Sequence, residues 1–188
     1  MLLIHHRRVA FIPLAVIYWT RIGFIARIDV AKLKGAFTKP EAHLKLVFVA
    51  YLPCFLCIVA FVWGLGFITP DPIVIALTVV FVIVNPTMEE LYWRKYLLTH
   101  LPWKSWAKIA FSTALFAASH PLMWGIFSLT LRSRIMVMPL LVMGVLWGIV
   151  YLKTKSLRHN IIAHALVDVL NLSIWVFLNI YVPPVVGA

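Results

Sequence analysis

The sequence predicts an all-α protein, a polytopic bundle of five or six membrane-spanning helices. Hydrophobic residues make up 63% of the 188 residues and charged residues only 12%. A soluble domain is roughly half apolar and about a quarter charged, so the composition excludes that class. The apolar residues also fall in runs close to the length of about 20 residues that crosses a bilayer. A chain of 188 residues with this many spans has no room for a separate soluble domain.

Each expected span is one of these apolar runs. The clear ones are residues 46–68, 73–88, 109–129, 135–152 and 161–182. Residues 9–26 are a weaker candidate, because Arg21 interrupts the run. This arginine snorkels to the interface if the segment spans, or lies on the polar face of a surface helix. The basic start resembles a signal peptide, but no small-residue cleavage site follows, so we expect an uncleaved anchor or an interfacial helix.

Basic residues separate the spans and give the chain a formal net charge of +11. They are not gathered into a soluble patch, so we expect contact with the lipid bilayer and no binding of nucleic acid. Cytoplasmic loops carry an excess of Lys and Arg, which places residues 27–45, 94–108 and 153–158 on the cytoplasmic side. The basic turn at 132–134 does not fit this pattern. We expect a multi-pass protein of the cell membrane.

The chain divides into three parts on this basis. Residues 1–70 form a basic segment with one or two accessory membrane helices, residues 71–182 form a helical core, and residues 183–188 form a short tail. Cys54 and Cys57 have the C-x-x-C spacing of a redox pair, but that motif belongs to a βαβ context. Inside an apolar helix we expect them to behave as small hydrophobic side chains.

Ionisable residues inside the apolar runs are the most informative feature. Such a residue costs about 3 kcal/mol near the bilayer centre, so it usually faces the bundle interior and carries function. They are Glu89, Glu90 and Arg94 near the end of one span, His120 inside the next, and His164 and Asp168 inside the last. Three separate spans therefore each supply an acid or a histidine.

The two adjacent glutamates have different partners available. Glu90 and Arg94 are four residues apart, so a helix places them on one face where they can pair. Glu89 points about 100° away and has no local partner. We therefore predict that Glu90 is structural and that Glu89 is free to handle a proton. The alternative is a solvated helix end with interfacial charges.

The histidines lie on polar faces of otherwise apolar helices. His120 shares a face with Ser112 and Phe116, where a lone histidine is often a packing residue. Asn160, His164, Asp168 and Asn171 fall at i, i+4, i+8 and i+11. This stripe either forms hydrogen bonds between helices or contains an imidazole that an aspartate orients for acid–base catalysis.

Together, the acids and histidines of three spans are sufficient to activate a water and stabilise an oxyanion. The zinc-protease signature H-E-x-x-H is absent.

These motifs resemble those of the CPBP family of intramembrane proteases, named for CAAX processing and bacteriocin processing. That family carries E-E-x-x-x-R, then F-x-x-x-H, then H-x-x-x-N or H-x-x-x-D, each in a transmembrane helix. The chain has "EELYWR" at 89–94, "FAASH" at 116–120 and "HALVD" at 164–168, in the same order. The resemblance covers about residues 72–172 and leaves the first 70 residues outside it.

The resemblance implies a helical bundle with its active site inside. It implies an endopeptidase acting on a membrane-embedded or lipid-anchored peptide or protein, with no cofactor and no metal. The implied catalytic residues are Glu89, His120, His164 and Asp168, and the implied supporting residues are Glu90, Arg94 and Phe116. Glu89 and His120 would activate a water that attacks a peptide carbonyl without a covalent intermediate. His164 and Asp168 would lie near the oxyanion.

Asp168 has two possible roles, since the prenyl-protein branch of the family has Asn at this position. An ionised carboxylate accepts hydrogen bonds but cannot donate one. Asp168 is therefore either a neutral donor, which we favour, or a charged group that orients His164. Two other functions stay open: a non-catalytic membrane scaffold or immunity protein of the same fold, and a proton or ion transporter. We see no duplicated half or broken helix pair of the kind that transporters often show.

Overall fold

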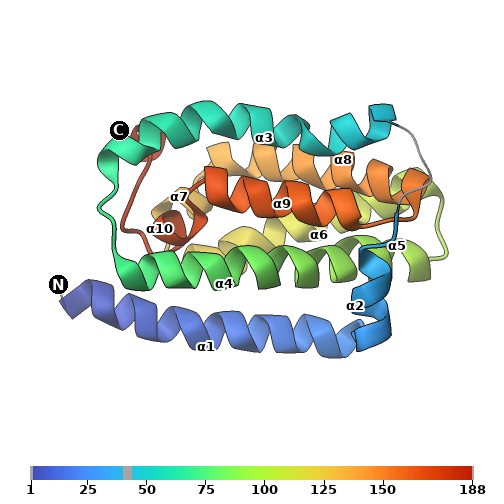
Figure 1. Cartoon of the computed structure of the whole chain (residues 1–188), viewed down its shortest axis with the longest axis horizontal. Helices are drawn as coiled ribbons and strands as arrows, with labels where there is room; N and C mark the ends of the chain where they lie inside the picture. Colours follow the sequence, from blue (N-terminus) through green and yellow to red (C-terminus); the bar gives the residue numbers. More distant parts are fainter. Residues whose placement is uncertain (1, 40–43, 188) are drawn as a thin grey trace.

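The computed structural model describes residues 2–39 and 44–187, and every regular element within them is helical. The elements are α1 (Leu2–Ile25), α2 (Val30–Ala36), α3 (Leu44–Gly64), η1 (Leu65–Phe67), α4 (Pro72–Glu89), η2 (Glu90–Tyr96), α5 (Leu97–His100), α6 (Ser105–Met123), η3 (Trp124–Ile126), α7 (Leu129–Arg132), η4 (Arg134–Met136), α8 (Val137–Thr154), α9 (Arg158–Leu170), α10 (Ser173–Phe177) and α11 (Pro184–Gly187). The long helices run side by side (Figure 1). The all-α prediction is confirmed.

Four stretches of helix are long and apolar enough to cross a bilayer. They are Lys45–Phe67, Pro72–His100, Ser105–Ile126 and Arg134–Thr154. Val9–Ile25 and Val30–Ala36 meet at 95° and make a fifth candidate if the bent pair is one span. The protein is therefore a multi-pass membrane protein with four or five candidate spans, and four of the five clear expected spans are found.

The remaining expected span, residues 161–182, is not one helix. α9 ends at Leu170, Leu172 adopts a left-handed conformation with φ of 53°, and α10 begins at Ser173. A left-handed residue ends an α-helix because the i→i−4 bonding cannot continue through it. All five residues of α10 are buried. The apolar run after the break therefore belongs to the protein core rather than to a lipid-facing span.

The described parts of the three basic loops lie at one end of the bundle, while residues 40–43 of the first loop lie outside the described residues. Ser156 Oγ donates a 2.7 Å hydrogen bond to the carbonyl of Thr38, which joins the loop after α8 to the segment after α2. A buried cluster that includes Ala36, Leu98 and Leu157 holds α2, α5 and the start of α9 together. Figure 1 shows α2 and α5 at this end and α7, which precedes the basic turn at 132–134, at the other. The basic loops thus share one end, as a common cytoplasmic side requires.

Two glycines bring α8 directly against α6. A Cβ at Gly144 would lie 2.6 Å from Thr113 Cγ2, and a Cβ at Gly148 would lie 3.3 Å from Ile109. Small residues four positions apart let membrane helices approach closely. This close contact places Trp147 of α8 opposite the face of α6 that carries the expected site residues.

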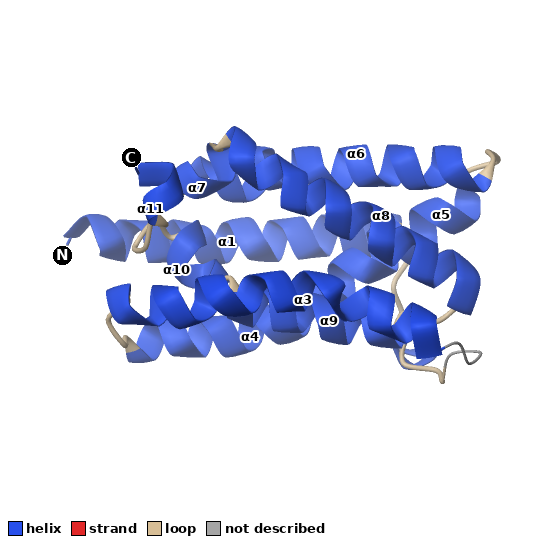
Figure 2. Cartoon of the chain, turned by 90° about the horizontal axis from the view of Figure 1, so that it is seen from above, coloured by secondary structure: helices blue, strands red, loops and turns tan. Residues whose placement is uncertain are grey.

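The N-terminal helix packs on the core rather than apart from it. Phe11 lies with ring centroids 6.0 Å from Phe81 of α4 and 5.5 Å from Trp124 of η3. Figure 2 shows the axis of α1 lying along those of α4 and α6, with α4 running in the same direction as α1 and α6 in the opposite direction. α1 therefore shares one buried cluster with α4 and η3.

The two cysteines are free thiols. Cys54 is buried in α3, and its thiol donates a 3.4 Å hydrogen bond to the carbonyl of Ala163 in α9. This thiol therefore takes part in packing between two helices.

Candidate active site

The residues that the sequence singles out converge in the bundle interior. Glu89 comes from α4, Glu90 and Arg94 from η2, Phe116 and His120 from α6, and His164 and Asp168 from α9. All seven are buried, and both glutamates are 0% exposed. This burial rules out the alternative of a solvated helix end.

The backbone is wider than an α-helix where the glutamate pair ends. Glu90–Tyr96 is a π-helix, and the N–H of Leu97 that follows it bonds to the carbonyl of Tyr92, five residues back. Such turns are rare and often mark functional sites. Nε of Arg94 still lies 3.4 Å from Oε2 of Glu90. The expected ion pair is present, but in a helical geometry that the spacing did not predict.

Glu90 contacts more than its arginine. Its Oε2 accepts a 3.3 Å hydrogen bond from Nδ2 of Asn160, and its Oε1 lies 3.1 Å from Nδ1 of His164. An ionised carboxylate only accepts, so His164 carries a proton on Nδ1 in this contact. Glu90 therefore joins η2 to α9 and fixes the histidine as well as holding Arg94.

Arg94 lies against two aromatic faces. Its guanidinium carbon is 4.3 Å from the ring centroid of Phe116 and 5.5 Å from that of Trp147. A desolvated cation over an aromatic ring is stabilised by about 2 kcal/mol. Nη1 and Nη2 form no hydrogen bond with any residue that the structure describes. Phe116 and Trp147 thus both present a ring to the cation of the Glu90–Arg94 pair.

His164 is the centre of the cluster. Its ring stacks on Trp147 with centroids 4.7 Å apart, and its Nε2 lies 3.8 Å from Oε2 of Glu89 and 4.0 Å from Oδ2 of Asp168. Since Nδ1 faces Glu90, one imidazole lies among three carboxylates. The structure thus unites the first and the third sequence motifs directly.

Glu89 has a partner that its own helix does not provide. Tyr18 of α1 donates a 2.8 Å hydrogen bond to Oε1. Oε2 accepts no hydrogen bond from the described residues and lies 3.8 Å from Nε2 of His164. The two oxygens of this carboxylate therefore differ: one is held and the other is available.

His120 has a defined tautomer in the neutral state. Its Nδ1 lies 2.8 Å from the carbonyl oxygen of Phe116, which can only accept, so the proton is on Nδ1 and Nε2 is an acceptor. Within the described residues, no hydrogen bond or ion pair joins His120 to Glu89. The structure does not bring these two expected partners into direct contact.

Asp168 is held by the break in the last helix. Ser173, the first residue of α10, donates a 3.1 Å hydrogen bond to Oδ1. Oδ2 makes no hydrogen bond with the described residues and lies near His164. One oxygen is fixed and the other is turned toward the cluster, as in Glu89.

A cavity of about 490 Å³ reaches this cluster. Phe116, His120, His164 and Asp168 lie on its wall, and most of the remaining wall is apolar and comes from α3, α8 and the segments after α9. Glu89 does not line the cavity, but its Oε2 lies 3.8 Å from Nε2 of His164, which does. The cavity thus joins an apolar space to the polar cluster.

Three residues of the cluster were not predicted from the sequence. They are Tyr18, Trp147 and Ser173, which contact Glu89, His164 and Asp168 respectively. Tyr18 and Trp147 are aromatic residues in apolar runs, where packing is the ordinary expectation, and Ser173 depends on the helix break. Asn160 also contacts an expected site residue, Glu90, and it was visible in the sequence as part of the polar stripe of the last apolar run.

Among the described residues, no group of three or more His, Cys, Asp or Glu side chains has an arrangement that could hold a metal ion. The residues present thus do not form a recognisable ligand set.

Comparison with protein families supports the resemblance seen in the motifs. A family model described as "Type II CAAX prenyl endopeptidase Rce1-like" matches residues 70–170, which is more than half of the chain. Comparisons with curated proteins and with solved structures gave no significant match. The matched part contains all three sequence motifs and excludes α1 and therefore Tyr18. Membership of this family suggests a CAAX-type intramembrane protease. The chain belongs to the Rce1-like family of type II CAAX prenyl endopeptidases.

Proposed function

We propose that the protein is an intramembrane endopeptidase of the cell membrane that hydrolyses peptide bonds with a water activated by Glu89. The observation that carries this proposal is the position of Oε2 of the buried Glu89, which accepts no hydrogen bond within the described part of the chain and lies 3.8 Å from Nε2 of His164. His164 lies on the cavity wall together with His120 and Asp168. Family membership supports peptide-bond chemistry. A carboxylate with histidines is a suitable set for general acid–base catalysis.

In the proposed reaction the water oxygen attacks the carbonyl carbon of the substrate while Oε2 of Glu89 takes a proton from the water. Nε2 of His120, an acceptor in the neutral ring, orients the water through its other hydrogen. The C–N bond then breaks, and Glu89 returns the proton to the leaving amine. Catalytic contacts are often loose before substrate binds, so Glu89 and His120 need not touch in its absence.

His164 and Asp168 would stabilise the oxyanion that forms on the carbonyl oxygen. This requires N–H or O–H donors about 2.7–3.1 Å from that oxygen. Because Nδ1 of His164 faces Glu90, its donor toward the cavity would be Nε2–H of the imidazolium. For Asp168 we propose the neutral form, which donates through Oδ2 while Oδ1 accepts from Ser173.

The proposed substrates are proteins or peptides that reach the site from within the membrane. The family implies protein or peptide substrates. The cavity has an apolar wall that includes the exposed side chains of Leu56, Met138 and Val142. Such a wall suits a membrane-embedded segment or a lipid-anchored chain end better than a charged soluble peptide.

The test is comparative peptidomics of cells that carry either the intact protein or the Glu89→Gln variant. We expect peptides with new termini only in cells with the intact protein. Asp29→Asn serves as a control, because Asp29 is an exposed N-cap whose role Asn also fills. A non-catalytic scaffold would retain its cellular role in Glu89→Gln, and a transporter would change ion or proton flux without changing peptide termini.

A further inference from the structure

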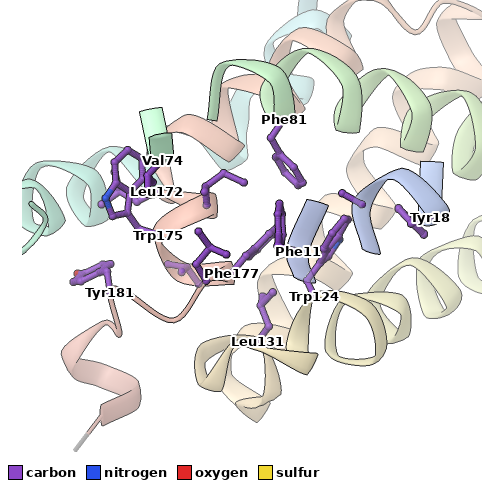
Figure 3. Close-up of a cluster of buried hydrophobic side chains, with 14 of the residues drawn as sticks. Phe11, Tyr18, Val74, Phe81, Trp124, Leu131, Leu172, Trp175, Phe177 and Tyr181 are labelled. Carbon is purple, nitrogen blue, oxygen red and sulfur yellow. The ribbon is translucent and has the colours of Figure 1, made fainter. Parts of the chain in front are cut away.

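α1 presents one continuous stripe of buried side chains to the rest of the bundle. Phe11, Ala15, Tyr18 and Ile22 are all buried, and their spacing of four, three and four residues is that of one helix face. Figure 3 shows Phe11 and Tyr18 on α1 in the same cluster as Phe81 and Trp124. The ring of Tyr18 meets that of Trp124 edge-on, with centroids 5.3 Å apart. The position of Tyr18 is thus fixed by packing.

Two adjacent side chains of α1 hydrogen-bond to α4. Nε1 of Trp19 donates to Oδ1 of Asn85 at 3.0 Å, and the hydroxyl of Tyr18 donates to Oε1 of Glu89 at 2.8 Å. Asn85 and Glu89 are one helical turn apart on α4. The pair of bonds aligns α1 with the polar face of the helix that carries the proposed base.

The hydrogen bond from Tyr18 fixes the terminal side-chain torsion of Glu89, which determines the direction of its two carboxylate oxygens. The terminal torsion of a glutamate is broad and nearly two-fold, so packing of the methylene groups leaves the carboxylate plane undetermined. With Oε1 held by Tyr18, Oε2 is the oxygen on the side of His164. A base must present a lone pair to the proton that it removes, within about 2.6–3.2 Å.

We propose that Tyr18 is a positioning residue, which holds Oε1 of Glu89 so that Oε2 is directed to the catalytic water. This inference rests on the proposed function and extends the site to α1, a helix outside the residues that match the family. Tyr18 acts through Glu89 and does not itself touch the substrate. α1, which lies before the residues that match the family, is then part of the catalytic apparatus.

The first test reads the hydrogen bond without any substrate. The chain has three glutamates, Glu41, Glu89 and Glu90, so glutamate labelled with ¹³C at the carboxyl carbon gives few signals. Glu89→Gln and Glu90→Gln assign the signals of the two site glutamates by removing them. We expect Tyr18→Phe to shift the Glu89 signal more than the Glu90 signal, and the control Tyr51→Phe to shift neither. Tyr51 is a suitable control because its hydroxyl contacts His159 instead.

The second test is kinetic and uses a substrate identified by peptidomics. The loss of a hydrogen bond to a charged group predicts a kcat about 10- to 100-fold lower in Tyr18→Phe, with KM unchanged. Tyr51→Phe should retain the wild-type values. The ring is retained in Tyr18→Phe, so the variant should fold, and its melting temperature should fall by no more than the loss of one buried hydrogen bond to a charged group explains.

The outcomes separate the two proposals. An unshifted Glu89 signal in folded Tyr18→Phe overturns the positioning role whatever the activity. A shifted signal with unchanged kcat also overturns it. A wild-type protein that cleaves nothing refutes the proposed peptidase and with it a positioning role in that reaction, while the carboxyl signal still reports whether Tyr18 holds Glu89.

Discussion

Nδ1 of His164 lies 3.1 Å from Oε1 of Glu90, so the carboxylate that pairs with Arg94 also orients the histidine on the cavity wall. The two adjacent glutamates therefore contact the same imidazole from different sides, since Glu89 faces its Nε2. Glu90 links the structural ion pair to the proposed chemistry. Replacing it should affect both.

The first prediction compares stability at the glutamate pair. Glu90→Gln should lower the melting temperature more than Glu89→Gln, because it leaves buried Arg94 without its opposing charge. Removing one partner of a buried ion pair costs about 3–5 kcal/mol. Gln at position 89 can still accept the hydrogen bond from Tyr18 through its amide oxygen. Thermal melts in detergent measure the difference, with Asp29→Asn as the exposed control, and equal losses for the two glutamate variants would contradict the assigned roles.

The second prediction concerns Asp168→Asn. Asn has nearly the same shape, its oxygen can accept from Ser173, and its amide can donate where Oδ2 stands. If Asp168 is a neutral donor, the variant retains most of the activity. The measurement is kcat/KM for both proteins on the same substrate. A reduction of more than about a hundredfold, or roughly 2.7 kcal/mol of barrier, would instead support a charged Asp168 that orients His164.

The third prediction tests the contact between α6 and α8. Gly144→Ala should destabilise the protein by about 1–3 kcal/mol, because the added methyl group overlaps the branched side chain of Thr113. Gly66→Ala is the matched control, since a Cβ there meets no atom within 4 Å. Melting temperatures in detergent distinguish the two. Adding Thr113→Ser to Gly144→Ala should recover part of the loss, and two alanine variants that melt alike would show that the close approach is unimportant.

The fourth prediction concerns metal. We expect cleavage by the purified protein to persist after thorough chelation, because the proposed reaction uses Glu89 and His120 on water directly. Metal content is measured on the same sample. Stoichiometric zinc together with activity that chelation removes and zinc restores would replace the proposal with a metallopeptidase.

The helices were predictable wherever an apolar run coincides with one continuous helix. Residues 46–68 and 135–152 show this, since their composition alone requires burial in lipid or protein. The run at 161–182 has the same composition, but the left-handed Leu172 divides it and the second half enters the core. An apolar composition predicts that a segment is shielded from water. It does not predict whether lipid or the rest of the protein surrounds that segment.

The site was predictable where residues lie on one helix and not where they meet between helices. The pairing of Glu90 with Arg94 follows from spacing, whereas its contact with His164 depends on how η2 packs on α9. Tyr18 is 71 positions from Glu89 in sequence, and an aromatic residue in an apolar run gives no signal of a hydrogen bond to it. The π-helical turn likewise has no sequence signature that we recognise.

The most direct test of the central claim is the cleavage rate of the purified protein on a substrate identified by peptidomics. The wild type, Glu89→Gln and Asp29→Asn are compared in detergent, with folding checked by thermal melts. The account predicts that Glu89→Gln stays folded and loses at least about a thousandfold in kcat, equivalent to roughly 4 kcal/mol of barrier, while Asp29→Asn retains the wild-type rate. A folded Glu89→Gln protein that cleaves at the wild-type rate would contradict it.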